Sequence, residues 1–119
     1  MRSRTSLLAE LVEQPIAEAT TVEALRAYGW DCDEHLFIVT KAHIRRILSS
    51  FYAGTIDSTQ VQDWANRIEG RDDIGYEEGG EGAVNEAIFW LANPYINYPI
   101  DEHIGQRIET LFESHEQAN

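Results

Sequence analysis

At the centre of the segment 61–97 stands the sequence Trp64–Ala65–Asn66–Arg67–Ile68–Glu69–Gly70–Arg71–Asp72–Asp73–Ile74–Gly75, and this segment decides the fold. Its first half carries apolar residues three and four positions apart, the pattern of an amphipathic helix with one buried face. Gly70 comes where a helix end favours a residue that tolerates a positive φ. We therefore expect a tryptophan-anchored helix, an acidic loop and a second buried helix that ends at Asn93–Pro94. The two stripes are Val61, Trp64, Ala65 and Ile68, and Val84, Ala87, Ile88 and Leu91.

Two further stretches predict helices with defined ends. Thr40 is a favoured N-cap residue and Gly54 a favoured stop. Asp57 caps the helix that contains Trp64, and Gln60 stands where a capping box needs it. The predicted fold class is all-α, a compact bundle of four main helices joined by short connections. The stripes of the two further helices are Ile44, Ile47, Leu48 and Phe51, and, after Pro99–Asp101, Ile104, Ile108, Leu111 and Phe112.

The residues before this bundle have weaker patterns. An apolar stripe over residues 7–12 ends at Gln14–Pro15, and Thr20 with Glu23 has the spacing of a capping box that opens a brief second helix. The apolar run 36–39 fits a short strand or an extended linker that buries Leu36 and Ile38. We expect one domain over residues 1–119, with 1–39 as an N-terminal arm and linker, 40–114 as the bundle and 115–119 as a frayed tail. The two short helices of the arm are either weakly held or form a lid over the main body.

The composition restricts the functions that the chain can have. With 43% hydrophobic residues among 119, it has enough apolar mass for a core, yet no run approaches the roughly 18 residues of a membrane span. A single cysteine and the lack of a signal-peptide pattern predict a cytoplasmic protein. The net charge of −12 argues against direct binding to nucleic acid or to anionic membranes. It favours a basic protein partner, or serves only to keep the protein dispersed.

Acidic residues are concentrated between the two central helices. Seven of them occur from residue 69 to residue 86, with Arg71 as the one basic residue. A docking surface for a basic protein is one interpretation, and an ordinary solvated loop is another. Asp72 or Asp73 can also have the structural role of pairing with Arg71. The spacing matches no EF-hand loop. The acidic candidates for partner binding are Asp72, Asp73, Glu77, Glu78 and Glu81.

No pattern of catalytic or metal-binding residues is present, so we predict a non-enzymatic protein without a cofactor. Cys32 and His35 have a spacing that can ligate zinc, but no second cysteine completes a structural site. The sequence contains neither a Gly-x-Ser-x-Gly nucleophile elbow nor a phosphate-binding Gly-x-x-x-x-Gly-Lys loop.

The aromatic residues suggest two kinds of role. Trp64 and Trp90 lie on or beside apolar faces and are expected to anchor the core. Phe89–Trp90 widens the apolar arc of its helix, so this helix is either central or covered by a partner, including a second copy in a homodimer. Tyr95 and Tyr98 flank Asn97 in a loop. They are candidate partner-binding residues, unless their side chains only pin the loop.

The block from Thr40 to Pro99 carries a resemblance. A helix ending in Phe–Tyr–Ala–Gly is followed by Asp63–Trp64–Ala65, then by an acidic motif around Arg71, then by Leu–Ala–Asn–Pro. This order resembles a small uncharacterised bacterial all-helical family and, more loosely, the bacterial self-protective immunity proteins of the colicin D type. Residues 1–39 are not part of that pattern.

The resemblance implies an all-α immunity protein that blocks a basic, tRNA-cleaving nuclease toxin with its acidic face. The first hypothesis is therefore an acidic helical binding protein. The second is a self-associating structural or regulatory domain that pairs through the Phe89–Trp90 helix. The third is a small enzyme that uses loop carboxylates with a divalent ion.

Overall fold

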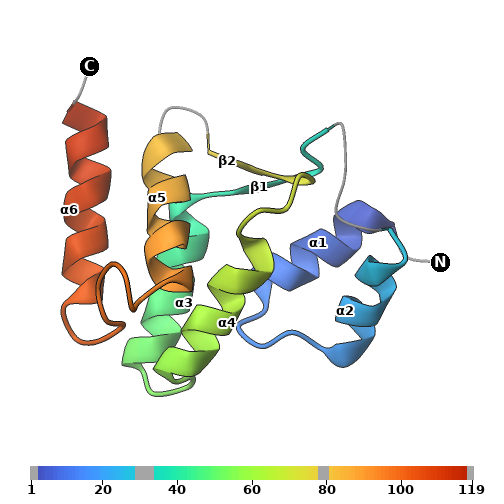
Figure 1. Cartoon of the computed structure of the whole chain (residues 1–119), viewed down its shortest axis with the longest axis horizontal. Coiled ribbons are helices and arrows are strands. Elements are labelled where there is room, and N and C mark those ends of the chain that lie inside the picture. The colour runs from blue at the N-terminus through green and yellow to red at the C-terminus, as the bar shows by residue number, and fades with distance from the viewer. Residues whose placement is uncertain (1–2, 29–33, 78–80, 118–119) are drawn as a thin grey trace.

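The computed structural model describes residues 3–28, 34–77 and 81–117. These residues form six helices and two short strands, so the prediction of a mainly helical chain is confirmed. The prediction of a purely helical four-helix bundle is wrong, because two strands pair within it. The elements are α1 (Arg4–Glu13), α2 (Ala19–Arg26), β1 (Phe37–Val39), α3 (Lys41–Tyr52), α4 (Ser58–Ile68), β2 (Ile74–Tyr76), α5 (Glu81–Ala92) and α6 (Ile104–Gln117), as Figure 1 shows.

The predicted N-caps of α3 and α4 and the predicted glycine after α4 are confirmed. The Thr40 hydroxyl accepts a bond from the His43 amide, and His43 Nδ1 accepts one from the Thr40 amide at 2.9 Å. Asp57 and Gln60 form the same reciprocal pair at the start of α4. Gly70 has a φ of +80° after α4. Helix α6 continues to residue 117, beyond the start of the expected frayed tail.

β1 confirms the short strand that was one interpretation of residues 36–39, and β2 replaces part of the expected acidic loop. β1 and β2 run parallel, with Phe37 opposite Ile74 and Val39 opposite Tyr76. Parallel strands need a crossover connection, and α3 and α4 supply it. Ile38 is 43% exposed whereas Val39 is fully buried, so the prediction that Ile38 is buried is wrong. Successive side chains of a strand point to opposite faces, and the pairing with β2 sets which face is covered.

Helix α1 belongs to the hydrophobic core, so the expectation of a weakly held arm is wrong. The Trp64 indole Nε1 donates to the Val12 carbonyl at 2.8 Å, although the two residues are 52 positions apart. Arg67 donates to the carbonyls of Leu11 and Gln14 at 3.1 and 3.0 Å, which satisfies the C-terminal end of α1. The buried side chains of α1 are Leu7, Leu8, Leu11 and Val12.

Helix α2 begins two residues earlier than predicted. Its N-cap is Glu18, and no side chain caps it, so the prediction of Thr20 as a cap is wrong. The next residue, Thr21, is buried and donates from its hydroxyl to Glu10 on α1 at 2.8 Å. The bond between Thr21 on α2 and Glu10 on α1 is therefore present in the structure, and the predicted capping box of Thr20 and Glu23 is not.

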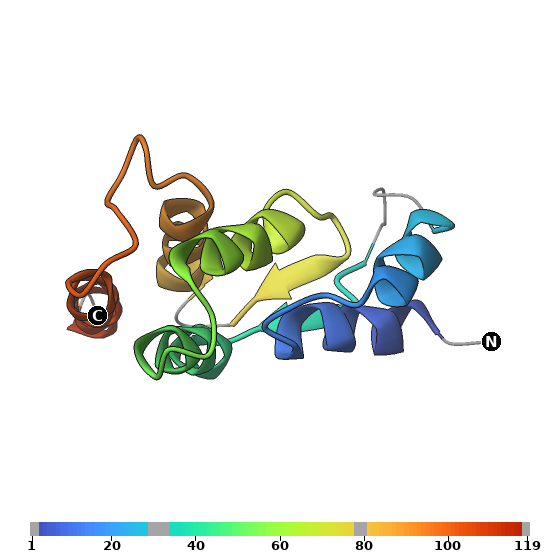
Figure 2. The ribbon, with the colours of Figure 1, turned by 90° about the horizontal axis from the view of Figure 1, so that it is seen from below.

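Helices α1, α3 and α5 pack against α4, which carries the fully buried Trp64. In Figure 2, α4 and α5 lie on one side of β2, and α1 and α3 lie on the other. Figure 1 shows α6 at one edge of the molecule and α2 towards the opposite edge. The end where α3 and α5 finish and α4 and α6 begin carries the long connection 93–103.

Candidate functional site

Asp73, one of the predicted contact residues, lies in the interior. Its carboxylate has no exposed surface and accepts two bonds of 2.9 Å from Arg71 and one of 2.8 Å from Arg4 on α1. Burial by itself would raise the pKa of Asp73, but the bonds and charges of the two arginines hold that pKa below its ordinary value. Asp73 thus has the structural role that was the alternative prediction, and it is not offered to a partner.

The remaining predicted residues do not form one surface. Asp72 is exposed in the turn before β2, and Glu77 is half-buried just after it. Glu78 lies outside the described residues, and Glu81 opens α5 with a side chain that is also outside them. Tyr95 follows the other end of α5, which at twelve residues is about 18 Å long. Glu77, just before α5, and Tyr95, just after it, therefore lie near opposite ends of this helix.

Tyr95 belongs to a turn that is fixed by hydrogen bonds. The Asn93 side chain donates to Glu69 and to the Phe89 carbonyl, each at 3.0 Å. The Asn97 side chain donates to the Asn93 carbonyl at 3.0 Å, and the Ile96 amide donates to the same carbonyl at 3.3 Å. On this turn Tyr95 is 94% exposed and Ile96 is 72% exposed. Two large apolar side chains are thus presented to solvent by a well-bonded backbone.

Several carboxylates and one more tyrosine lie at the same end of the molecule as this turn. The Tyr52 hydroxyl donates to the Asp101 carbonyl at 3.0 Å and accepts from the Gly105 amide, which ties α3 to the start of α6. Tyr95 shares a shallow pocket with Ser58 and Thr59, the residues that follow the exposed Asp57. We call this surface the acidic–aromatic end (Figure 1). Its residues are Tyr52, Asp57, Tyr95, Ile96, Asp101 and Glu102.

Two segments without lysine or arginine supply all six residues of the acidic–aromatic end. No lysine or arginine occurs between Arg46 and Arg67 or between Arg71 and Arg107. Arg107 itself lies over Tyr98, on the side of the molecule between α5 and α6. Arg45 of α3 shares a shallow pocket with Tyr52 and Glu102, but it is paired with Glu109 at 2.7 Å, so carboxylates predominate at this end.

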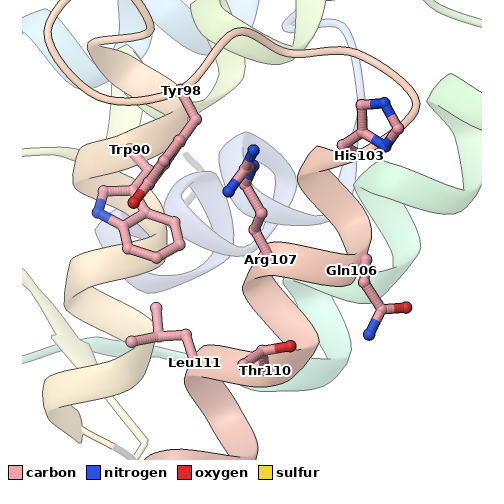
Figure 3. Close-up of a pocket in the computed structure, with 7 residues that line it drawn as sticks. All are labelled: Trp90, Tyr98, His103, Gln106, Arg107, Thr110 and Leu111. Atoms are coloured by element: carbon pink, nitrogen blue, oxygen red, sulfur yellow. The ribbon is translucent and has the colours of Figure 1, made fainter.

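A groove of about 480 Å³ runs between α5 and α6 (Figure 3). Trp90 and Tyr98 meet edge to face, with ring centroids 5.0 Å apart, and the Trp90 indole donates to Glu86 at 2.9 Å. Arg107 places its guanidinium carbon 4.5 Å from the centre of the Tyr98 ring. Tyr98 thus pins the loop, the alternative prediction, whereas Tyr95 does not. Trp90 is half-buried.

The described part of the chain has no metal cage. Within residues 3–28, 34–77 and 81–117, no three His, Cys, Asp or Glu side chains gather closely enough to hold an ion. Cys32 lies outside these ranges, so the zinc interpretation of Cys32 and His35 remains untested. None of the six helices found there has both the length and the apolar character to cross a bilayer.

Sequence reasoning missed several residues of these surfaces. Ile96 follows Tyr95 directly, but a lone isoleucine in a loop gives no sign of its exposure. Arg107 lies nine positions beyond Tyr98, and only the turn of the chain at Asp101 brings the two together. The long intervals without lysine or arginine are the one signal that could have indicated the acidic–aromatic end.

Comparison with known proteins identifies no family for this chain. The sequence matches no protein-family model, and no curated protein or solved structure is significantly similar to it.

Proposed function

We propose that this protein is a non-enzymatic binding protein that holds a basic protein partner at the acidic–aromatic end. The observation that carries the proposal is the exposure of Tyr95, at 94%, and Ile96, at 72%, on a turn fixed by the side chains of Asn93 and Asn97. Large apolar groups that are rigid before binding lose little conformational entropy in a complex. Tyrosine is also one of the residue types that contribute most at interface centres.

The sign of the partner's charge follows from the carboxylates around this pair. Asp57, Asp101 and Glu102 lie on the same end, and the chain as a whole carries a net charge of −12. Such a surface attracts a positively charged protein and repels nucleic acid and anionic membranes. The resemblance to colicin D-type immunity proteins gives the proposal a specific form, in which the partner is the basic nuclease domain of a toxin.

The experiment is affinity capture from an extract of the native cell, followed by calorimetry with the purified partner. The double variant Tyr95→Ala/Ile96→Ala should weaken binding by about tenfold or more, since these two side chains are the proposed centre of the interface. The matched control is Ile16→Ala/Ile38→Ala, which removes apolar side chains that are 53% and 43% exposed elsewhere. Equal affinity for the two double variants would contradict the proposal.

The charge is tested separately with Glu102→Gln. Loss of one exposed carboxylate at the interface rim should slow association and reduce its dependence on salt. Glu23→Gln on α2 is the control, because Glu23 is also exposed and lies outside the acidic–aromatic end. A partner that binds equally fast at low and high salt would count against a charge-guided interface.

Self-association is the alternative function, and Phe89, 38% exposed on α5, favours it. Sedimentation equilibrium at micromolar concentration distinguishes the two proposals. A dimer that Phe89→Ala dissociates would replace the basic-partner proposal, and a monomer would remove the alternative.

A further inference from the structure

We propose that the groove between α5 and α6 binds a small apolar carboxylic acid, with Arg107 as the residue that holds the carboxylate. This site is separate from the acidic–aromatic end and uses different side chains. Its volume of about 480 Å³ falls in the range of small-molecule sites. The residues that line it are Trp90, Tyr98, His103, Gln106, Arg107, Thr110 and Leu111.

The charge of the lining indicates the charge of the ligand. In the part of the chain that the structure describes, no aspartate or glutamate lines the groove, although the sequence has 21 of them among 119 residues. Glu86 and Glu102 approach only its margins, where Glu86 accepts from the Trp90 indole and Glu102 lies 3.5 Å from His103. An anion in the groove is therefore next to a guanidinium without a carboxylate in the same wall.

Arg107 is oriented for such an anion. Its guanidinium carbon lies 4.5 Å from the centre of the Tyr98 ring, a contact that favours the positive charge. Among the described residues, no carboxylate lies within ion-pair distance of Arg107, whereas Arg45 on α3 is paired with Glu109 at 2.7 Å. A guanidinium that packs on a ring can still donate through its edge to both oxygens of one carboxylate.

The rest of the groove fits the apolar part of the ligand. Figure 3 shows Arg107 extending toward Tyr98 and Trp90, with Leu111 below the two rings. The edge-to-face contact of Trp90 and Tyr98 makes a wall of aromatic surface, and Leu111 extends it. Gln106 and Thr110 supply polar groups on the α6 side. A ligand with a flat apolar group and one carboxylate fits this groove, because the flat group can lie on the aromatic wall while the carboxylate contacts Arg107.

The test uses phenylacetate and indoleacetate as probes, with phenylacetamide and indoleacetamide as neutral partners of the same shape. Ligand-observed NMR detects binding, and titration gives affinities. At least one acid should bind saturably below about 10 mM, and its amide should bind about tenfold more weakly or not at all. Failure of both acids to saturate, or equal affinity of the acid and its amide, would overturn the proposal.

Two variants that each remove one positive charge test where the acid binds. Arg107→Gln should weaken binding of the acid by about tenfold, and Arg45→Gln should leave it within about twofold of wild type. Unchanged binding in Arg107→Gln would overturn the assignment of Arg107. The comparison of acid with amide on the wild-type protein keeps the test decisive even if Arg107→Gln does not fold. Because Tyr95 and Ile96 lie outside the groove lining, Tyr95→Ala/Ile96→Ala should leave acid binding unchanged.

Discussion

Asp73 shows how one buried side chain determines the packing of distant segments. Its carboxylate receives Arg71 from the same turn and Arg4 from α1, 69 positions away. A buried carboxylate is stable as an ion only with such partners. The pair with Arg4 therefore holds the N-terminal helix against the turn that leads into β2.

Replacement of Asp73 by Asn should be strongly destabilising. It leaves two guanidiniums, 14% and 8% exposed, against a neutral amide. Breaking a buried ion pair by removal of one partner costs about 3–5 kcal/mol, and we expect a loss of this size in urea unfolding. Asp72→Asn, at the exposed neighbouring position, is the control and should change the free energy of unfolding by less than about 0.5 kcal/mol. Similar losses in both variants would contradict the role of Asp73.

The same ion cluster predicts an acid-sensitive contribution to stability. The folded pKa of Asp73 lies below its ordinary value of 3.8, so the folded state favours the charged form. This contribution is fully present above the ordinary pKa and is lost as the pH falls through it toward the folded pKa. The Asp73→Asn variant should lack this part of the acid titration of stability.

His43 makes the free energy of unfolding depend on pH in a range above that of Asp73. Its Nδ1 accepts a bond from the Thr40 amide, which requires the unprotonated ring, and burial lowers the pKa of His43 below 6.5. Charges of Glu13 and Glu77 act against this shift and that of Arg46 adds to it. The cap is intact above the unfolded pKa, so the free energy of unfolding should fall as the pH drops through about 6.5.

Variants of His43 and of the exposed His103 test whether His43 causes this pH dependence. In His43→Gln a side-chain oxygen accepts the same bond without titrating, so the slope of stability between about pH 7.5 and pH 5.5 should decrease. His103→Gln, at an exposed position in the connection before α6, should keep the wild-type slope. An unchanged slope in His43→Gln would show that another group titrates.

For single residues, the sequence predicted the features that depend on neighbours in the chain, such as helix ends. Thr40 and Asp57 begin helices through bonds with residues three positions away, and Gly70 follows a helix end with a φ of +80°. All three signals are local, and the sequence predicted all three. Asp72 and Asp73 are indistinguishable in the sequence, because the arginine that separates their roles comes from α1. Burial of a single polar residue depends on distant segments and has no local signal.

Among the elements, α1 differs most from what its sequence indicates. Its four apolar residues form a stripe too short to be stable by itself in water. The Trp64 indole and the Arg67 guanidinium reach its last carbonyls from α4, so the helix is completed by another element. A short helix of this kind becomes part of the core through contacts that follow 50 or more residues later.

We therefore expect Leu8→Ala to destabilise the whole protein. Leu8 is fully buried, and truncation of a buried leucine to alanine costs about 2–5 kcal/mol. The denaturant midpoints followed by tryptophan fluorescence and by circular dichroism should shift together. Ile16→Ala, at a residue that is 53% exposed, should cause little change. If Leu8→Ala altered only local exchange near the N-terminus, α1 would be a detachable arm.

Of the two strands, β1 was predicted as one of two alternatives for residues 36–39, and β2 was not predicted. The run 36–39 is apolar throughout and shows no alternation, and Ile74–Gly75–Tyr76 contains a glycine and lies among acidic residues. Each strand has three residues, so most of its definition comes from pairing with the other. A Cβ at Gly75 would come within 2.6 Å of His35 and 2.9 Å of Ile38, a close approach that appears only in three dimensions.

At the scale of the whole molecule, the surface is more acidic than the composition suggests. Three of the nine lysines and arginines donate hydrogen bonds within the protein around α1. Arg67 donates to backbone carbonyls, and Arg4 and Arg71 donate to the carboxylate of Asp73. The excess of acidic residues is therefore left with fewer cations at the surface. Repulsion among those carboxylates opposes the compact state.

Salt should consequently stabilise the free protein and weaken its complex with a basic partner. Between about 0.01 M and about 0.15 M NaCl the screening length falls from about 30 Å to about 8 Å, so long-range repulsion within the folded chain decreases. Urea, which is uncharged, is the denaturant that allows the measurement, and the free energy of unfolding should rise over this range. The attraction to a positively charged partner is screened by the same ions and should fall. A stability that decreases with salt would mean that ion pairs such as Asp73–Arg71 outweigh the repulsion.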